Sequence, residues 1–514
     1  MNQKRETTGY SRWISAVGLA VLLVISAVFS YNNIKPRLAA VPQHTGTSLP
    51  TSPVSPADVS SQTETSAKPT EPTQPTAPLE ETVKLKYVRI TKAVNIRAKD
   101  NDTAEKIGTA MKGDELPLVS ETQSRYQIKM SNGKIGWIVK SCAELLEKET
   151  VIKHLPVYTS GAPIKMNGTQ EGDGLRDILK SYGTVGGQVA IIKNGQVAYH
   201  YEYGYADKEN KKKVTENTKY RIASVTKVFT AMMAMRQVDD GTLDLDEDLS
   251  KIMGYKVRHP SFPKQPVTTR MLLTHTAGLV DREKMYGPAL KEKLSDPDHY
   301  SSQPGKSFLY SNLSMGTAGA VLEKRSGQII SEYARDKFFS PMGLDASFDA
   351  KYLSDKTLVA NCYEGSQLSH DNKYLTRAQS RGKPGETYHL TAGGLLISAE
   401  DLASLYSVLV NDGQYNGQQV LSEKSLKEML TKQCETKKNF VQCIGIRRKD
   451  KLVGERNLYY HNGEAYGIHS LMALDMQDKS GVIVITSGAS AARNDNTVFA
   501  VCDAVLNYCY ENVL

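Results

Sequence analysis

Two residues of different chemical character stand three positions apart near the middle of the chain. The stretch RIASVTKVFTAMMAM, residues 221–235, contains Ser224 and then Lys227 at the start of an apolar run. If a helix begins at Ser224, the lysine amine lies one turn on and reaches the serine hydroxyl. Burial among apolar side chains favours the neutral, basic form of the amine. The pair is a candidate nucleophile and base, and the alternative is a serine and a lysine that only cap and flank a core helix.

A second candidate group follows in PGKSFLYSN, residues 304–312, where Tyr310 and Asn312 come after a Pro-Gly turn. A tyrosine beside a cationic lysine shifts towards its phenolate form, so Tyr310 can serve as a base and then as an acid to a leaving group. The Asn312 amide can bind a substrate carbonyl and orient Lys227. Taken alone, the motif is also typical of a turn with a polar cap.

The third group is the His461-Asn462-Gly463 stretch at the start of an expected strand. A glycine lets substrate approach the strand edge, and the next backbone N–H, that of Glu464, can complete an oxyanion hole with the N–H of Ser224. His461 is expected to project a polar or cationic group into the cleft. A lone surface histidine is the alternative interpretation.

These motifs occur in a known order: YRIASVTKVFTA, LLTHTAGL, PGKSFLYSN, TAGGLLISAEDLASL and HNGEAYG. With them, the region from about 165 to 510 resembles the serine β-lactamase-like hydrolases. The resemblance is to their class C-like group, which includes class C β-lactamases, D-alanyl-D-alanine carboxypeptidases, D-aminopeptidases and esterases. The resemblance implies that Ser224 is the acylated nucleophile and that Lys227 and Tyr310 are the acid–base pair. It also implies that Asn312 anchors the substrate and that His461 and Gly463 belong to the strand motif.

The strand motif departs from the pattern of classical β-lactamases and most penicillin-binding proteins. Those proteins begin the motif with a lysine that attracts a substrate carboxylate, and here His461 stands in its place. With an ordinary pKa of about 6.5, this histidine would be half-charged to neutral at physiological pH. The histidine form is common in the peptidase and esterase branches of the family. It argues against efficient antibiotic hydrolysis and against strict recognition of a free carboxylate.

The first residues predict a membrane anchor. Lys4, Arg5 and Arg12 precede an uncharged apolar stretch at 13–31, which is just long enough to cross a bilayer as a helix. Cations before the stretch place the N-terminus in the cytoplasm and the remainder outside. A cleaved signal peptide is the alternative. The sequence therefore predicts a single-pass protein of the cell membrane with an extracellular catalytic domain.

A Pro-, Ser- and Thr-rich stretch at 32–82 is expected to form an extended linker. The alternating segments that follow at 84–146 predict a small all-β barrel of about five strands. Through VNIR, KGD and NGKIGWI this segment resembles the bacterial SH3-like domains, and the resemblance implies binding to peptidoglycan. A spacer without a ligand is the alternative.

Composition excludes some function classes. The net charge of +8 is spread over 514 residues without a basic stripe, so nucleic acid is not an expected partner. The six cysteines show no metal-ligand spacing, and no metal or cofactor is expected. Cys434 and Cys443 flank an expected turn and can pair in an oxidising compartment, whereas free thiols are expected at most of the other positions.

The expected fold of the last region is an α/β (α+β) domain of the β-lactamase and penicillin-binding-protein type, with an antiparallel sheet and a helical lobe. Strands are expected at 188–204 and near 468–488, and helices near 271–279, 391–410 and 494–514. The predicted organisation is a cytoplasmic tail, a transmembrane anchor, a linker, an SH3-like domain and a hydrolase domain, at 1–12, 13–31, 32–82, 84–146 and 155–514.

The predicted function is that of an extracytoplasmic serine hydrolase that acts through an acyl-enzyme on D-alanyl groups of the cell wall, most plausibly as a D-alanyl-D-alanine carboxypeptidase. The expected partners are peptidoglycan or teichoic acid, together with β-lactams. A D-alanyl esterase acting on teichoic acid and a β-lactamase use the same chemistry and stay open. A receptor that binds penicillin or muropeptides without turnover is the non-enzymatic alternative.

Overall fold

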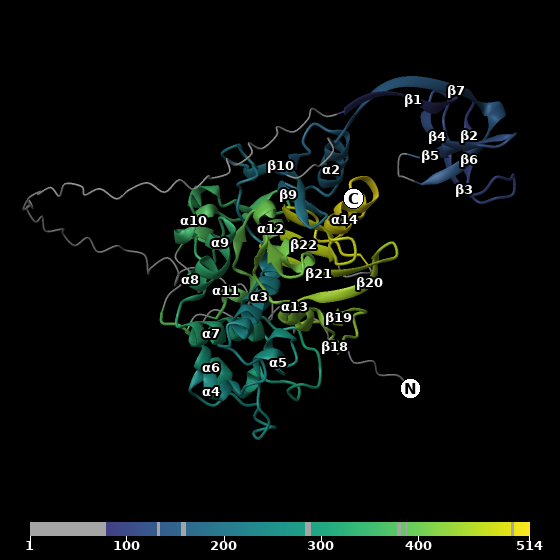
Figure 1. Cartoon of the computed structure of the whole chain (residues 1–514). Helices are drawn as coiled ribbons and strands as arrows, with labels where there is room; N and C mark the ends of the chain where they lie inside the picture. Colours follow the sequence, from purple (N-terminus) through teal and green to yellow (C-terminus); the bar gives the residue numbers. More distant parts are fainter. Residues whose placement is uncertain are drawn as a thin grey trace, which may run out of the picture. The chain divides into compact units, whose positions relative to one another are not determined.

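The computed structural model describes residues 79–130, 134–155, 161–282, 289–377, 382–386, 388–494 and 498–514 (Figure 1). The predicted cytoplasmic tail, the anchor at 13–31 and nearly all of the predicted linker lie outside these residues. Within the described ranges, no helix combines the length and the apolar character that a membrane span needs. The anchor therefore stays a prediction.

Residues 79–154 form an antiparallel sheet of seven strands in the order β3-β2-β6-β5-β4-β1-β7, two more than the sequence predicts. Its first strand begins inside the predicted linker, and its last extends beyond residue 146. Val88, Ile96 and Ile128 are among the side chains of its small core. The identification as an SH3-like barrel stays a prediction. The strands are β1 (Leu79–Ile90), β2 (Val94–Arg97), β3 (Lys106–Ala110), β4 (Glu115–Glu121), β5 (Arg125–Lys129), β6 (Ile135–Val139) and β7 (Ala143–His154).

The large sheet of the hydrolase domain has the order β11-β10-β9-β23-β22-β21-β20-β19-β18, with β8 beside β10. The predicted hairpin is confirmed, because Asn194 and Gly195 both have positive φ, 53° and 78°, as a type I′ turn requires. The strands are β8 (Ile164–Lys165), β9 (Gly186–Lys193), β10 (Gln196–Asp207), β11 (Lys212–Lys213), β18 (Cys434–Glu435), β19 (Val441–Gln442), β20 (Arg447–Val453), β21 (Arg456–Ala465), β22 (Ile468–Asp475) and β23 (Ser480–Ser487).

The central strands are buried on both faces, because helices cover each side of the sheet (Figure 1). Val482 and Val484 of β23 pack with α2 (Gln170–Ser181) and α14 (Ala500–Asn512). Ile483 and Ile485 of the same strand belong to the larger core of the helical lobe. The alternation of side chains along a strand thus divides one apolar run between two cores.

The helical lobe surrounds α3 (Thr226–Asp239), whose side chains are nearly all buried. The helix expected within 391–410 is confirmed as α12, and Leu396–Ile397 before it forms β15, which pairs with β12 (Tyr220–Arg221) and separates α11 from α12. The other helices are α4 (Leu249–Met253), α5 (Thr269–Leu273), α6 (Leu290–Ser295), α7 (Asn312–Ser326), α8 (Ile330–Ala334), α9 (Ser340–Met342), α10 (Asn372–Thr376), α11 (Leu390–Gly393), α12 (Ala399–Val410) and α13 (Glu423–Leu430).

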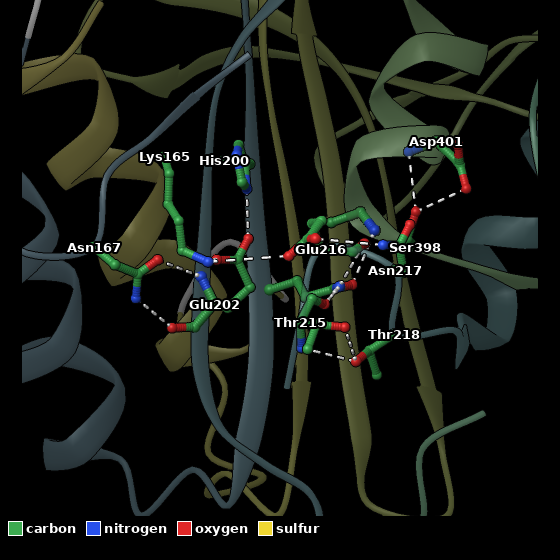
Figure 2. A network of polar contacts seen from close by, with 12 residues as sticks. Lys165, Asn167, His200, Glu202, Thr215, Glu216, Asn217, Thr218, Ser398 and Asp401 are labelled. Carbon is green, nitrogen blue, oxygen red and sulfur yellow. Dashed lines mark hydrogen bonds and ion pairs between the residues drawn. The ribbon is translucent and has the colours of Figure 1, made fainter. Parts of the chain in front are cut away.

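A polar network ties β8 to β10 at the edge of the large sheet (Figure 2). The Glu202 carboxylate is buried there, 2.9 Å from the Lys165 ammonium and 2.5 Å from the His200 ring. Burial alone raises the pKa of Glu202, but the bonds from His200 and Lys165 bring it below its ordinary value. This charge is therefore held by partners that compensate it.

All six cysteines are free thiols. The pairing of Cys434 with Cys443, which the sequence allows, is absent from this structure, and Cys434 lies opposite Gln442 in the β18–β19 ladder. The Cys443 thiol instead donates to the Leu430 carbonyl at 3.2 Å.

Candidate active site

Ser224 lies on a strained turn immediately before α3. It belongs to the 3-10 helix η2 (Ala223–Val225), so the α-helix begins two residues later than the sequence analysis assumes. The preceding residue, Ala223, has φ of 49°, a left-handed conformation that a non-glycine residue rarely adopts. Such strain persists only where the surroundings impose it, and it commonly marks functional sites.

Lys227 is fully buried, and its amine still reaches Ser224. The Nζ atom lies 3.0 Å from Ser224 Oγ, 2.8 Å from Asn312 Oδ1 and 2.5 Å from the Ala392 carbonyl oxygen. In the described ranges it forms no ion pair with a carboxylate. Burial lowers the pKa of the amine, and the positive charge of Arg447 acts in the same direction. The neutral amine that can accept the serine proton is therefore favoured.

Tyr310 faces both Lys227 and Arg447. Its ring centroid lies 5.0 Å from Lys227 Nζ and 5.2 Å from the guanidinium carbon of Arg447. Burial by itself raises the pKa of the phenol, but Lys227 and Arg447, together with hydrogen bonds from Lys227 and Ser224, bring it below its ordinary value. The structure thus brings together a hydroxyl, an amine and a phenol that can exchange a proton.

Asn312 links Lys227 to a carboxylate, Asp281. Its side-chain nitrogen donates to Asp281 Oδ2 at 2.9 Å, and its oxygen accepts from Lys227. Asp281 also accepts the backbone N–H of Asn312 and of Leu313 and the hydroxyl of Ser311. The amide therefore contacts Lys227, as predicted, while one of its two N–H groups is bound to Asp281. The binding of a substrate carbonyl by the other N–H stays a prediction.

Gly463 brings β21 against the serine turn. A Cβ atom at this position would lie 3.0 Å from the Ser224 backbone nitrogen and 2.6 Å from the Ile222 carbonyl oxygen, so a side chain has no room. The β20 strand pairs with β21 only as far as Tyr460, opposite Arg447. Residues 461–465 are paired with β22 on one side alone, which leaves an open edge beside Ser224. The oxyanion role of the Glu464 N–H stays a prediction.

His461 is a buried neutral group, one of the two states that the sequence leaves open for it. It is 1% exposed, and burial, together with the nearby Arg447 and Lys227, holds its pKa well below the ordinary value. As a neutral ring, its Nδ1 donates to the Asn462 carbonyl at 2.8 Å. A positive charge that could attract a substrate carboxylate has to come from another residue.

Arg447 is that residue, and the sequence analysis missed it. Its Nη1 donates to Asn462 Oδ1 at 2.9 Å, while its buried Nε atom has no hydrogen-bond partner. It forms no ion pair with a carboxylate in the part of the chain that the structure describes. Arg447 lines a cleft of about 500 Å³ whose other walls are Ser224, Phe308, Tyr310, Asn312, Lys438, Phe440, Asn462, Glu464 and Arg493.

His275, from the LLTHTAGL stretch, is a further residue of this site. It has φ of 57°, and its Nδ1 accepts the backbone N–H of Ser311 at 3.2 Å. Its ring centroid lies 4.5 Å from that of Tyr310, and burial holds its pKa well below the ordinary value. A neutral ring here supports Tyr310 without adding charge.

Solved structures of several hydrolases share the fold. The chain is similar to a penicillin-binding protein homologue from Pyrococcus abyssi, with 24% identity, coverage of 62% of this chain and 73% of that one, and a TM-score of 0.52. A D-amino acid amidase from Ochrobactrum anthropi SV3 is 23% identical, with 67% and 99% covered and a TM-score of 0.53. At these identities the likeness shows the fold.

Curated relatives match the same region. Protein flp of Staphylococcus aureus (strain MRSA252) is 27% identical over 313 residues, and penicillin-binding protein 4* of Bacillus subtilis (strain 168) is 26% identical over 175 residues. The match to flp covers 59% of this chain and 59% of the relative, and the match to the Bacillus protein covers 31% and 37%. The family model described as Beta-lactamase matches residues 173–501. The chain therefore belongs to the beta-lactamase family, as a serine β-lactamase-like hydrolase.

Proposed function

We propose that the chain is a serine carboxypeptidase that removes the terminal residue from D-alanyl-D-alanine peptides of the cell wall. One observation carries the proposal: the unpaired guanidinium of Arg447 stands beside the open edge of β21, in the same cleft as Ser224. A guanidinium recognises a carboxylate with two parallel hydrogen bonds. The free C-terminus of a peptide is such a group.

The residues of the cleft support a two-step reaction. Lys227 in its neutral form accepts the Ser224 proton as Oγ attacks the peptide carbonyl, and the backbone N–H groups of Ser224 and Glu464 stabilise the oxyanion. Tyr310 transfers a proton to the nitrogen of the leaving D-alanine, which departs and leaves an ester on Ser224. Water, deprotonated by the same pair, then hydrolyses the ester and restores the serine hydroxyl.

A charge-deletion experiment tests the carboxylate contact. We expect Arg447→Gln to lower kcat/KM for a D-Ala-D-Ala peptide by about 30-fold, since hydrogen bonds to charged groups contribute about 1.5–3 kcal/mol. The corresponding peptide amide, which lacks the carboxylate, is expected to lose less, only the part that comes from the raised pKa of Lys227. Arg448→Gln, one residue along β20, is the matched control. Equal losses on both substrates, or no loss on either, contradict the proposal.

Assays with other substrates separate the alternatives that share the chemistry. Release of D-alanine from D-alanylated teichoic acid but from no peptide identifies an esterase, and rapid turnover of nitrocefin identifies a β-lactamase. Binding of muropeptides without acylation of Ser224 by a fluorophosphonate identifies a receptor. Ser224→Ala is the control for each reaction.

We further propose that residues 13–31 anchor the chain in the membrane, with the hydrolase domain outside the cell. Its support is the uncharged stretch and the cations that precede it. Protease treatment of intact cells is expected to remove the hydrolase domain and to leave a membrane-bound fragment. Recovery of full-length protein in the medium contradicts the anchor.

A further inference from the structure

A polar hollow of about 640 Å³ lies at the tip of the β9–β10 hairpin and shares no wall with the catalytic cleft. Its walls are that tip, one face of α12, and the turn of a second hairpin, formed by β16 (Gln414–Tyr415) and β17 (Gln418–Gln419). The α12 helix packs against β9 and β10 (Figure 1). The volume is within the range of sites for small ligands, about 300–1,000 Å³.

The register of the large sheet separates the hollow from the reaction centre. Gly463, beside the Ser224 nitrogen, is in line across the strands with Gln188 of β9. Asn194, at the hairpin tip, lies about 20 Å further along that strand. A ligand that fills the hollow therefore leaves the residues of the catalytic cleft free.

Two tight turns form the rim of the hollow and are bonded to their surroundings. The dipeptides Asn194-Gly195 and Asn416-Gly417 have positive φ at both residues, as type I′ turns require. The Gly195 N–H donates to the Lys479 carbonyl oxygen at 2.7 Å, and the Gly195 carbonyl accepts from the Asn411 amide. The rim is therefore formed before a ligand binds, which lowers the entropy that binding costs.

The side chains around the hollow keep hydrogen-bonding capacity that the protein does not use. The amides of Asn194, Gln414 and Asn416 have no hydrogen-bond partner among the described residues. Each of them offers donors and an acceptor. The half-buried Glu400 carboxylate likewise forms no hydrogen bond or ion pair in the described ranges. Because such a carboxylate has lost part of its hydration, an O–H group of a ligand that donates to it forms a strong, charge-assisted hydrogen bond.

The remaining walls determine the charge of the hollow and one apolar contact. Of the described residues that line it, only Glu400, Asp412 and Lys479 are charged, and Asp412 is paired with Lys479 at 2.9 Å. The hollow thus carries a net negative charge, which disfavours an anionic ligand. The half-buried Tyr415 packs on the core of the helical lobe and offers the hollow an aromatic ring with a hydroxyl at its edge.

We infer that this hollow binds a neutral oligosaccharide. The hydroxyl groups of a sugar both donate and accept hydrogen bonds, which matches the amide side chains, and they can donate to the Glu400 carboxylate. The C–H face of a pyranose ring packs on an aromatic ring such as that of Tyr415. The inference goes beyond the proposed carboxypeptidase function and does not depend on it, because the site lies on a part of the domain that does no chemistry.

Titration calorimetry of the full-length chain in detergent micelles tests the ligand. The probes are chitotetraose, which is neutral, and tetragalacturonate, which has a carboxylate on every ring. We expect binding of the neutral probe alone, since the net charge of the hollow repels the anion. Equal binding of both probes, or binding of neither, overturns the inference.

Two removals with matched controls test the place of the site. Glu400→Ala should weaken the binding of chitotetraose by about tenfold, because a hydrogen bond to a charged group is lost. Gln414→Leu should weaken it by about fivefold, through the loss of a neutral hydrogen bond. The controls are Glu423→Ala, at an exposed glutamate in the first turn of α13, and Gln418→Leu, at an exposed glutamine of β17. Neither residue lines the hollow, and both controls should bind as the wild type does.

Labelling of Ser224 with a fluorophosphonate separates this site from the catalytic cleft. All four variants should be labelled at the wild-type rate, which shows that they fold. Saturating chitotetraose should also leave the rate unchanged, because the hollow lies about 20 Å away along the sheet. Slower labelling, or equal affinity of Glu400→Ala and the wild type, would place the sugar elsewhere and overturn the inference. None of these outcomes measures peptide cleavage, so the carboxypeptidase proposal stands or fails separately.

Discussion

Two buried titratable groups of the hydrolase domain, Glu202 and Lys227, lie in opposite electrostatic surroundings. Glu202 is 7% exposed and has a lysine and a histidine on its carboxylate. Lys227 is 0% exposed and forms no ion pair with a carboxylate among the described residues. Its amine is bound to the oxygens of Ser224, Asn312 and Ala392, and burial outweighs Tyr310 and Asp281, which raise its pKa. Burial acts against the charged form of both groups, yet Glu202 remains an anion, whereas the pKa of Lys227 is lowered.

The difference shows how one fold makes both a structural and a reactive group from buried side chains. A buried charge with opposite partners keeps its charge and ties strands together. A buried amine given acceptors but no counter-charge is pushed towards its neutral form, which makes it a base. Substitutions in the two places should therefore have opposite effects on activity and on stability.

Lys227→Met should have the largest effect. Removal of the base is expected to lower the rate of Ser224 acylation by about 10³- to 10⁴-fold. The free energy of unfolding should change by less than about 1 kcal/mol, because the lost hydrogen bonds offset the relief of a buried amine. Labelling with a fluorophosphonate and denaturant unfolding measure the two quantities. Retained acylation would remove Lys227 from the proposed mechanism.

Glu202→Gln should give the reverse pattern, with a loss of about 2 kcal/mol of stability and unchanged kcat/KM. The half-exposed Glu216, 4.0 Å from Lys165, is the matched control as Glu216→Gln and should cost much less. A loss of activity with intact stability would contradict the comparison.

The stability difference between wild type and Glu202→Gln should depend on pH. Because folding lowers the pKa of Glu202, its contribution is complete above the unfolded pKa of about 4.3 and is lost as the pH falls through the folded value. The two unfolding curves should therefore converge in acid. A difference that persists at the lowest pH would mean that the carboxylate charge is not the stabilising feature.

Asp281→Asn should have a smaller effect, an approximately tenfold fall in kcat with KM little changed. The substitution weakens the bonds that fix the Asn312 amide, and the orientation of Lys227 depends on that amide. Ser311→Ala, which removes only one of the bonds to Asp281, is the comparison and should cost less. An equal fall in both variants would indicate a local loss of structure instead.

The smallest expected change is a shift in the pH profile of acylation. The rate should rise with pH as Lys227 loses its proton, with a midpoint below that of an ordinary lysine, because burial lowers its pKa. Arg447 contributes to the same lowering, so Arg447→Gln should move the midpoint to higher pH. A midpoint that moves to lower pH would contradict this electrostatic role.

The sequence could predict the parts of the site that depend on local spacing. Ser224 and Lys227 are one turn apart, and Asn312 begins a helix after a Pro-Gly turn, so their types and neighbours suffice. Arg447 could not be found in this way, because its place depends on where β20 stops pairing with β21.

The charge states of the site residues could not be predicted from the local sequence either. His461 has an ordinary sequence context, and its neutrality follows from burial by distant segments. The contact of Asp281 with the start of α7 joins residues about thirty positions apart in sequence. Likewise, the sequence does not predict β15, because that strand exists only through its pairing with the distant β12.

The pairing of β1 with β7 has a mechanical consequence. Their ladder runs without interruption from Leu79 opposite His154 to Ile90 opposite Ala143, so the chain leaves the seven-stranded sheet beside the point where it enters. Tension between the segment before β1 and the hydrolase domain passes across that first pair and loads the ladder one rung at a time. The sheet is thus a side branch of the chain: its excision would shorten the path between its neighbours in sequence by only about 5 Å, the spacing of two strands.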